Sequence, residues 1–231
     1  MSNELNYVRI LNESLQDASP FEVLKLSVEK LFKKKLIYVC SFGAESAVIL
    51  HMISRINKNL PIVLLNTNFL FKETIDYKNY LLEKLELNNF KEILPDERDL
   101  LNKDKRNLWK INPDLCCNIR KVQPLNKVLK GYNAWISGRK SYHNGERKGV
   151  KFFELLDQKI IINPLVDSDM KFIDNYFEKN KIERHPLFKK GFLSIGCTHC
   201  TKKTIDLENP RSGRWSDTTK TECGIHKNFY K

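Results

Sequence analysis

Five of the six cysteines in this chain of 231 residues are grouped in a way that favours metal or redox chemistry. Cys116 and Cys117 are adjacent, Cys197 and Cys200 form a Cys-x-x-Cys turn, and Cys223 stands alone further on. A Cys-x-x-Cys turn aims two thiolates at one point, whereas two adjacent cysteines scarcely form a relaxed disulfide with each other. The two pairs predict a four-thiolate centre with a separate reactive thiol; buried cysteines combined with a disulfide are the alternative.

A second candidate site is the turn over residues 41–46, which reads Ser-Phe-Gly-Ala-Glu-Ser. It follows the apolar run 36–41, which is typical of a buried parallel strand, and it precedes an apolar helix expected over 47–53. Free backbone N–H groups and the helix dipole make such a turn suitable for an anion. We interpret Cys40 as a core residue and His51 as a packed histidine rather than a ligand.

An alternation of strands and helices must position these groups. Strands are expected at 36–41, 61–66, 90–94, 133–138, 150–155 and 159–164, and helices at 20–33, 47–53, 71–87, 120–130 and 169–180. The lysine-rich segment 96–110 is expected to be a solvated connection. The alternation predicts one doubly wound α/β domain, 1–231, with a mostly parallel sheet. Within it we distinguish an N-terminal helical segment (1–35), an α/β core (36–186) and a partly irregular C-terminal tail (187–231).

The composition narrows the class of protein. Hydrophobic residues make up 41% and charged residues 29%, as in ordinary globular proteins. The N-terminal residues lack the apolar core of a signal peptide, and no run approaches ~18 apolar residues. We therefore expect a cytoplasmic protein with no membrane segment, a setting in which paired cysteines hold metals or do redox chemistry more often than they form structural disulfides.

The net charge of +12 could attract a nucleic acid. The lysines that supply most of this charge are scattered, however, and no stretch interleaves basic residues with exposed aromatics. A generally positive surface also helps to collect small anionic substrates. We therefore favour a small anion over a polynucleotide as the partner.

Taken together, the motifs resemble the phosphosulfate reductase family, in the cluster-bearing form that acts on adenylyl sulfate. The matching blocks are SFGAESAV (41–48), NTNFLFKET (66–74), CCNIRKVQPL (116–125), AWISGRK (134–140), GFLSIGCTHCT (191–201), RSGRW (211–215) and ECGIH (222–226). The first two occur more widely among adenylate-binding α/β enzymes, whereas the CC, CxxC and ECGIH set is specific. The resemblance implies an adenine nucleotide alpha hydrolase-like fold.

The activity that this resemblance implies is reduction of adenosine 5′-phosphosulfate (APS) to sulfite and AMP, with thioredoxin as the reductant, in sulfate assimilation and cysteine biosynthesis. Cys223 would be the nucleophile that forms a cysteine thiosulfonate. The four paired cysteines, Cys116, Cys117, Cys197 and Cys200, would hold a 4Fe-4S cluster. Zinc is the rival metal because four thiolates suit either centre, although the adjacent doublet differs from a zinc ribbon with two Cys-x-x-Cys halves.

The resemblance also assigns residues to the substrate. These are Ser41, Phe42, Gly43, Leu65, Asn66, Thr67, Lys121, Arg139, Arg211, Arg214 and His226, with Lys140 as a further anion contact. Two stretches depart from the family pattern. Asn66-Thr67-Asn68 replaces Asp-Thr-Gly, and we expect Asn68 to take the left-handed backbone that glycine would have supplied. The run from Arg139 to His143 replaces an Arg-Arg-x-Gln-like run, which weakens the assignment of that loop.

Three other interpretations stay open on the sequence alone. The substrate can be the 3′-phosphorylated form, PAPS, which extra lysines would tolerate. A cluster-dependent tRNA sulfur-transfer enzyme would use the positive charge, but it should need a Ser-Gly-Gly-x-Asp-Ser loop where this chain has residues 41–46. A zinc-bearing nucleic-acid module would need its cysteines closer together. The sequence does not decide whether the protein forms a homo-oligomer.

Overall fold

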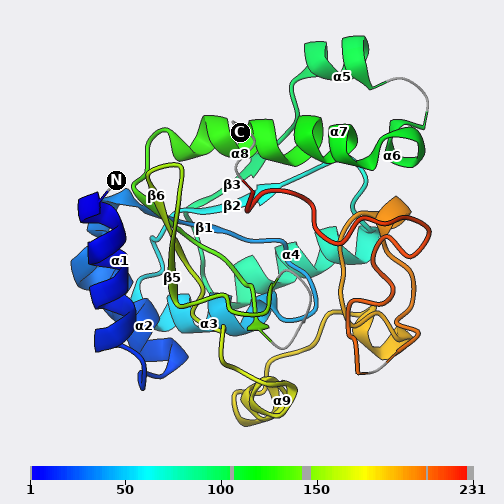
Figure 1. Cartoon of the computed structure of the whole chain (residues 1–231). Helices are drawn as coiled ribbons and strands as arrows, with labels where there is room; N and C mark the ends of the chain where they lie inside the picture. The colour runs from blue at the N-terminus through cyan, green and yellow to red at the C-terminus, as the bar shows by residue number, and fades with distance from the viewer. Residues whose placement is uncertain (1, 105–106, 142–146, 207, 228–231) are drawn as a thin grey trace.

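The computed structural model of the chain describes residues 2–104, 107–141, 147–206 and 208–227. The strands in these residues form a six-stranded sheet in the order β3-β2-β1-β4-β6-β5 (Figure 1). They are β1 (Leu36–Val39), β2 (Ile62–Leu65), β3 (Phe90–Ile93), β4 (Ala134–Ile136), β5 (Phe153–Leu156) and β6 (Lys159–Ile162). Neighbouring strands are parallel except β5, which is antiparallel to β6. The expected mostly parallel α/β fold is confirmed.

Helices cover both faces of the sheet (Figure 1). One face carries α1 (Ser2–Ser14), α2 (Pro20–Leu26), α3 (Ser46–Ile56), α4 (Lys72–Lys84) and α9 (Met170–Lys179). The other carries α7 (Pro113–Cys117) and α8 (Gln123–Leu129), joined by the π-helical turn Asn118–Val122, with α5 (Glu97–Lys103) and α6 (Leu108–Ile111) packed beside α7. A π-helical turn, Ser27–Leu31, and a 3₁₀ turn, Lys33–Lys35, connect α2 to β1.

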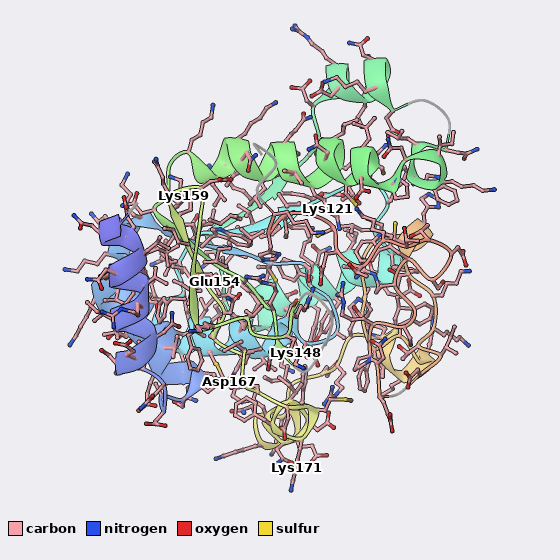
Figure 2. The ribbon with its side chains drawn as sticks, viewed as in Figure 1. Lys121, Lys148, Glu154, Lys159, Asp167 and Lys171 are labelled. Carbon is pink, nitrogen blue, oxygen red and sulfur yellow. The ribbon has the colours of Figure 1, made fainter. Side chains whose placement is uncertain are left out.

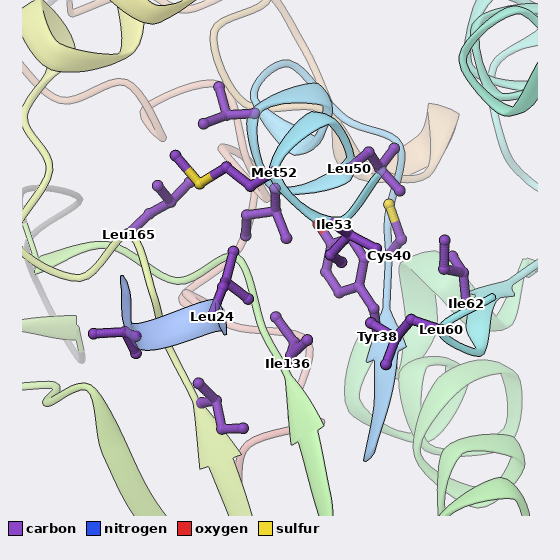
Figure 3. Packing of buried hydrophobic residues seen from close by; sticks show 14 of the residues in the cluster. Leu24, Tyr38, Cys40, Leu50, Met52, Ile53, Leu60, Ile62, Ile136 and Leu165 are labelled. Atoms are coloured by element: carbon purple, nitrogen blue, oxygen red, sulfur yellow. The ribbon is translucent and has the colours of Figure 1, made fainter. Parts of the chain in front are cut away.

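The alternation of side chains along the strands builds a hydrophobic layer on each face of the sheet. In β1, Leu36 and Tyr38 belong to the layer beneath α2, α3 and α4, whereas Ile37 belongs to the layer beneath α8. Figure 3 shows the first layer, in which Leu24 of α2 and Ile53 of α3 lie over the sheet. Because both faces are buried, the strands read as continuous apolar runs in the sequence.

Two expectations about the segment before the cysteine doublet are wrong. Residues 96–110 are not a simple solvated connection, because α5 and α6 lie there. The Asp96 carboxylate caps α5, which stabilises a helix too short to show in the sequence pattern. The next helix begins at Pro113 rather than near residue 120. Cys116 and Cys117 therefore lie inside a helix, not ahead of one.

The two side chains excluded as ligands are packed as expected. Cys40 is 2% exposed and lies in the hydrophobic layer of Figure 3. His51 Nδ1 lies 2.9 Å from the hydroxyl oxygen of Tyr176 in α9, so the imidazole has a partner at the edge of the core.

The C-terminal tail is irregular, as expected, and packs against the carboxyl ends of the central strands (orange to red in Figure 1). Its described residues after Leu187 contain two 3₁₀ turns, Phe188–Lys190 and Thr198–Cys200, and isolated bridges from Leu70 to Cys197 and from Thr201 to Arg214. Across the described parts of the chain, no helix combines the length and apolar character needed to cross a bilayer.

Candidate active site

A cavity of about 190 Å³ opens at the carboxyl ends of β1 and β4. The order of the sheet reverses between these strands, since β2 and β3 follow on one side and β6 and β5 on the other. Ligands of open α/β sheets bind at such a switch point. Ser41 and Gly43 line the cavity after β1, Ser137 and Arg139 line it after β4, and the C-terminal tail closes it from outside.

The turn after β1 lines this cavity mostly with small residues, namely Ser41, Gly43, Ala44 and Ser46. The Gly43 N–H donates to Ser46 Oγ over 3.1 Å and lies 3.4 Å from Ser41 Oγ. A β-carbon at Gly43 would lie 3.3 Å from the carbonyl oxygen of Ile195, so glycine allows the tail to approach the turn closely. Phe42, with a φ of 48°, sends its side chain into the core, where it meets Phe90 edge-on. The predicted substrate contact of Phe42 can therefore involve only its backbone.

Basic side chains dominate the wall of the cavity. The lining includes Lys121, Arg139, Lys140, Arg147, Arg211 and Arg214, together with the carboxylates of Glu45 and Glu222. Grouped cations at a partly buried site repel one another unless counter-anions neutralise them. The cavity is therefore suited to a ligand that carries several negative charges.

Several of these cations already pair with carboxylates inside the protein, Arg139 and Lys140 among them. Lys140 Nζ lies 2.5 Å from Glu45 Oε2, and Arg139 pairs with Glu154, which Figure 2 shows on β5. Burial lowers the pKa of both Arg139 and Lys140, and their carboxylate partners oppose that shift. These pairs hold the wall of the cavity, and the cations of the tail face its interior.

Three cationic side chains of the tail lie close to the indole ring of Trp215. The charged group of Arg214 lies 4.3 Å from the ring centroid, that of Arg211 5.8 Å and that of Lys220 5.9 Å. Such cation–π contacts offset part of the repulsion between neighbouring guanidinium groups. Burial, and next the charge of Arg147, lower the pKa of Arg211 to about 9. An anionic ligand would relieve this repulsion.

Gly196 makes room for Arg214, and Gly213 makes room for the backbone that precedes it in the tail. A β-carbon at Gly196 would overlap its guanidinium group, and one at Gly213 would overlap the carbonyl oxygen of Lys202. Arg214 Nε also donates a hydrogen bond to the Cys200 carbonyl oxygen over 3.1 Å. The arginine is therefore tied directly to the Cys-x-x-Cys turn.

The structure brings the cysteine doublet and the Cys-x-x-Cys turn together beside the cavity. Cys116, Cys117 and Cys197 are buried, Cys200 is half-buried, and all four are free thiols. Thr67 Oγ1 lies 3.2 Å from Cys197 Sγ. The two pairs also interact electrostatically, because negative charge on Cys197 or Cys200 raises the pKa of Cys116. The alternative of a disulfide is not supported.

These thiols fit a metal centre by their chemistry. Burial raises the pKa of Cys116 to about 11 and that of Cys117 to about 12, and it raises the pKa of Cys200 as well. Thiols of such low acidity ionise at neutral pH only beside strong positive charge, which a bound metal supplies. The three buried thiols and the half-buried Cys200 thiol are therefore compatible with a metal or iron–sulfur centre.

Lys121 interacts electrostatically with both cysteine pairs and with Cys223, the predicted nucleophile. Cys223 reaches the cavity from the tail and is half-buried. Burial acts to lower the pKa of Lys121, but negative charge on Cys197, Cys223 and Cys117 outweighs it and raises the pKa well above its ordinary value. In Figure 2, Lys121 lies just beneath the helices α7 and α8, on the side of the sheet. One ammonium group thus serves both the cysteine pairs and Cys223.

His226 is anchored at the floor of the cavity. Its Nε2 lies 2.9 Å from Ser137 Oγ, and its ring stacks on Trp135 at 4.8 Å between centroids. Burial, and next the charge of Arg139, lower the pKa of His226 well below its ordinary value. The imidazole is therefore neutral at physiological pH and fixes the end of the tail by packing and a hydrogen bond.

Three predicted substrate residues, Phe42, Asn66 and Thr67, do not line the cavity, whereas Leu65 does. Asn66 Nδ2 donates to a carboxylate of β3 over 2.5 Å, and Thr67 is buried against the Cys-x-x-Cys turn. Asn68 has a φ of 62°, so it takes the expected left-handed conformation. In the loop after β4, positions 142 and 143 lie outside the described residues.

The lining residues that were not predicted include Glu45, Arg147, Trp215 and Glu222. Glu45, Trp215 and Glu222 stand inside the motifs SFGAES, RSGRW and ECGIH, so proximity to predicted residues was a usable signal. The signal for Arg147 was weaker, namely its place at the end of the polar run that follows β4.

The chain is similar to relatives with known names. Residues 35–203 match the family model of the phosphoadenosine phosphosulfate reductase domain. A Mesorhizobium japonicum protein named adenosine 5′-phosphosulfate reductase is 39% identical over 208 residues, which cover 90% of this chain and 82% of that protein. A protein of the same name from Chelativorans sp. is 42% identical over 189 residues, covering 81% of this chain and 77% of that protein.

Solved structures agree with the fold. The phosphoadenylyl-sulfate reductase of Candida auris, in a phosphate complex, has a TM-score of 0.73 and 27% identity, covering 85% of this chain and 97% of that one. Yeast FAD synthetase, at 14% identity and a TM-score of 0.55, covers 80% of this chain and 66% of its own and shares the adenine nucleotide alpha hydrolase-like fold. Together with the family match, these likenesses show that the chain belongs to the phosphoadenosine phosphosulfate reductase family.

Proposed function

We propose that this protein reduces APS to sulfite and AMP in the cytoplasm, with thioredoxin as the reductant, in sulfate assimilation leading to cysteine. The observation that carries the proposal is the convergence of one lone thiol, Cys223, with six basic side chains in a single cavity at the switch point of the sheet. Relatives that are 39% and 42% identical are named for this activity.

The nucleotide lies across the carboxyl ends of β1, β2 and β4 in this proposal. The strand ends carry the contacts to phosphate and adenosine, from Ser41, Phe42, Gly43, Leu65, Asn66 and Thr67. Phe42, Asn66 and Thr67 act through their backbone, because their side chains are engaged elsewhere. Arg139 and His226 complete the wall beside the nucleotide.

The first chemical step is attack of the Cys223 thiolate on the sulfate sulfur. A bond forms between Cys223 Sγ and that sulfur, while the bond from the sulfur to the bridging oxygen breaks and AMP leaves with the electron pair. The product is a cysteine thiosulfonate. Arg211 and Arg214 neutralise the anionic substrate so that a second anion can approach it, and the Lys121 ammonium group favours the thiolate form of Cys223.

The second step releases sulfite. A thioredoxin thiolate attacks Cys223 Sγ, the bond from Sγ to the sulfonate sulfur breaks, and sulfite leaves with the electron pair. Cys223 and thioredoxin are then joined in a mixed disulfide, which the second thioredoxin thiol resolves to regenerate the Cys223 thiolate. The two electrons gained by the sulfate sulfur therefore come from thiols.

The cysteines at the cavity wall, Cys116, Cys117, Cys197 and Cys200, would hold a 4Fe-4S cluster. Four cysteine thiolates suit either zinc or an iron–sulfur cluster, and the adjacent doublet differs from the two Cys-x-x-Cys halves of a zinc ribbon. When bound, the cluster contributes to the electrostatic field around Lys121.

APS is the favoured substrate, and PAPS is the competing one. The relatives at 39% and 42% identity are named for APS, whereas the Candida auris enzyme, at 27%, is named for PAPS. A tRNA sulfur-transfer enzyme is less consistent with the geometry, since Glu45 of the first turn is held by Lys140 rather than free to bind a metal–ATP complex.

Anaerobically purified protein tests the proposal directly. We expect about four irons and matching sulfide per chain, and release of sulfite from APS with thioredoxin and thioredoxin reductase, faster than from PAPS. Cys223→Ser should abolish sulfite release and keep the iron. Sulfite production by the Cys223→Ser variant, or loss of its iron, would contradict the division of roles.

A further inference from the structure

The carboxylate of Glu222 stands next to the proposed nucleophile, and the reaction steps above do not use it. Arg147 holds it at two points, with Nε 2.5 Å from Oε1 and Nη2 3.1 Å from Oε2. Arg211 Nη2 lies 3.2 Å from the same Oε1. The side chains of Glu222, Arg147 and Arg211 are 15%, 12% and 12% exposed, so water screens these contacts little. Forked pairs between arginine and a carboxylate fix geometry as well as charge.

These contacts join two distant parts of the chain. Arg147 follows β4 and precedes β5, whereas Glu222 lies 75 positions later in the irregular tail. Arg211 also donates to the carbonyl oxygen of Thr221 over 2.7 Å. On the other side of Cys223, His226 is held by Ser137 and Trp135, as described above. With no helix or strand in this part of the tail, side-chain anchors before and after Cys223 determine where its sulfur lies.

We propose that Glu222 is a positioning residue that holds Cys223 at the cavity through its forked pair with Arg147; this rests on the proposed role of Cys223. The bonds are unequal, because Arg147 makes two contacts with the carboxylate and Arg211 makes one longer contact. The oxyanion of the phosphosulfate takes the place of Glu222 on Arg211, and the fork to Arg147 keeps the tail in place. The Glu222 carboxylate is therefore paired with Arg211, the arginine proposed to contact the sulfate, until substrate binds.

Glu222→Gln tests this assignment, because the amide keeps the shape of the side chain and removes its charge. Asp217→Asn is the matched control, since it removes one charge from a carboxylate of the same tail that is 73% exposed and lies 2.7 Å from Lys202. Amide hydrogen exchange of tail peptides over 216–227 is measured without substrate on the anaerobically purified protein. The values of kcat and KM for APS are measured in parallel.

We expect exchange in the tail of Glu222→Gln to be about tenfold faster and its kcat about tenfold lower, with KM changed by less than about threefold. Asp217→Asn should match the unmodified protein in all three. The proposal would be overturned if both amide exchange and kcat were unchanged in Glu222→Gln. It would also be overturned if KM rose while kcat stayed the same, because Glu222 would then act in substrate binding. If the unmodified protein releases no sulfite, the proposed function fails, while the exchange comparison still decides whether Glu222 anchors the tail.

Discussion

At the scale of single residues, the cations of the cavity differ in the kind of group that lies next to their positive charge. Arg139 and Lys140 face carboxylates inside the protein, whereas burial acts to lower the pKa of Lys121 and its cysteine neighbours act to raise it. A cation whose counter-charge is a thiolate stabilises the reactive form of that thiol at neutral pH. Lys121 should therefore matter to the chemical step as well as to substrate binding.

Replacing Lys121 with methionine tests this point, because the apolar side chain keeps nearly the same length without the charge. We expect kcat/KM for APS to fall by about 10²- to 10³-fold, as when one preorganised electrostatic contact is removed. Iron content should not change, since the ligand set is intact. Lys127→Met is the control on the same stretch of helix, where the side chain is 61% exposed. Normal turnover in the Lys121→Met protein would show that the nucleophile needs no such cation.

Gly196 gives a second prediction at this scale. A β-carbon there would overlap the Arg214 guanidinium group, so Gly196→Ala should displace Arg214 from Trp215. We expect KM for APS to rise at least about tenfold, and the free energy of unfolding to fall by about 1–3 kcal/mol, as in overpacked sites. Steady-state kinetics and chemical unfolding measure the two effects. Gly131→Ala, where nothing lies within 4 Å, should leave both near the original values.

At the scale of elements, the strands could be predicted from sequence because sheets buried on both faces give uninterrupted apolar runs. The helices α5 and α6 could not be predicted in the same way. Helix α5 has no buried residue, and α6 buries Leu108 alone among its four positions, so neither shows a helical period. Their stability comes from capping and from packing beside α7, which a local pattern does not record.

The candidate site, like the helices, could be predicted from the sequence only in part. Motifs singled out Cys223, Arg211 and Arg214 as candidate site residues, and all three line the cavity. The pair between Arg147 and Glu222 could not be predicted, because 75 positions separate its members and only the folded tail brings them together. The direction of the Phe42 side chain was likewise set by a positive φ that the sequence does not specify.

A chain of stacked side chains joins the elements around the cysteine pairs. Trp109 of α6 stacks on His199 at 4.3 Å between ring centroids, and Phe69 meets the other side of His199 edge-on at 4.7 Å. The guanidinium group of Arg120 lies 3.9 Å from the Phe69 ring and pairs with the buried carboxylate of Asp104. This stack connects the loop after β2, the helix with the doublet and the Cys-x-x-Cys turn.

Trp109→Ala should therefore make the distance between the two cysteine pairs more variable. We expect the variant to bind less iron on reconstitution and to lose it faster in air, because a preformed ligand set binds metal more tightly than a mobile one. Iron and sulfide per chain, followed over time after exposure to oxygen, give the measurement. Ile111→Ala is the control in the same helix, at a side chain that is 76% exposed. Equal iron retention in both variants would argue against the stack.

At the scale of the whole molecule, His185 fastens the start of the tail to the helical layer. It is fully buried, its Nε2 lies 3.0 Å from Thr74 Oγ1 in α4, and its Nδ1 accepts a hydrogen bond from the backbone N–H of Leu187 over 3.1 Å. Burial lowers the pKa of His185 to about 4, although Glu73 opposes the shift. The native state thus holds this histidine neutral.

The stability of the protein should therefore decrease in acid. An unfolded histidine has a pKa near 6.5, so between about pH 6.5 and pH 4 the unfolded chain binds the extra proton and stability is lost as the pH falls. His185→Asn keeps an acceptor for Leu187 and cannot titrate in this range. We expect the unfolding free energy of the unmodified protein to fall by about 2–3 kcal/mol more than that of the variant between pH 7.5 and pH 4.5. Chemical unfolding at a series of pH values measures this, and parallel curves would contradict it.

The chain supplies its reaction centre late during synthesis. The last strand, β6, ends at Ile162, whereas the second cysteine pair begins at Cys197 and the lone thiol follows at Cys223. A nascent polypeptide can therefore complete its sheet while Cys116 and Cys117 still lack their partner thiols. In the proposed function, the ligand set of the cluster is therefore complete only after Cys200 has been synthesised, and the proposed nucleophile, Cys223, follows later still.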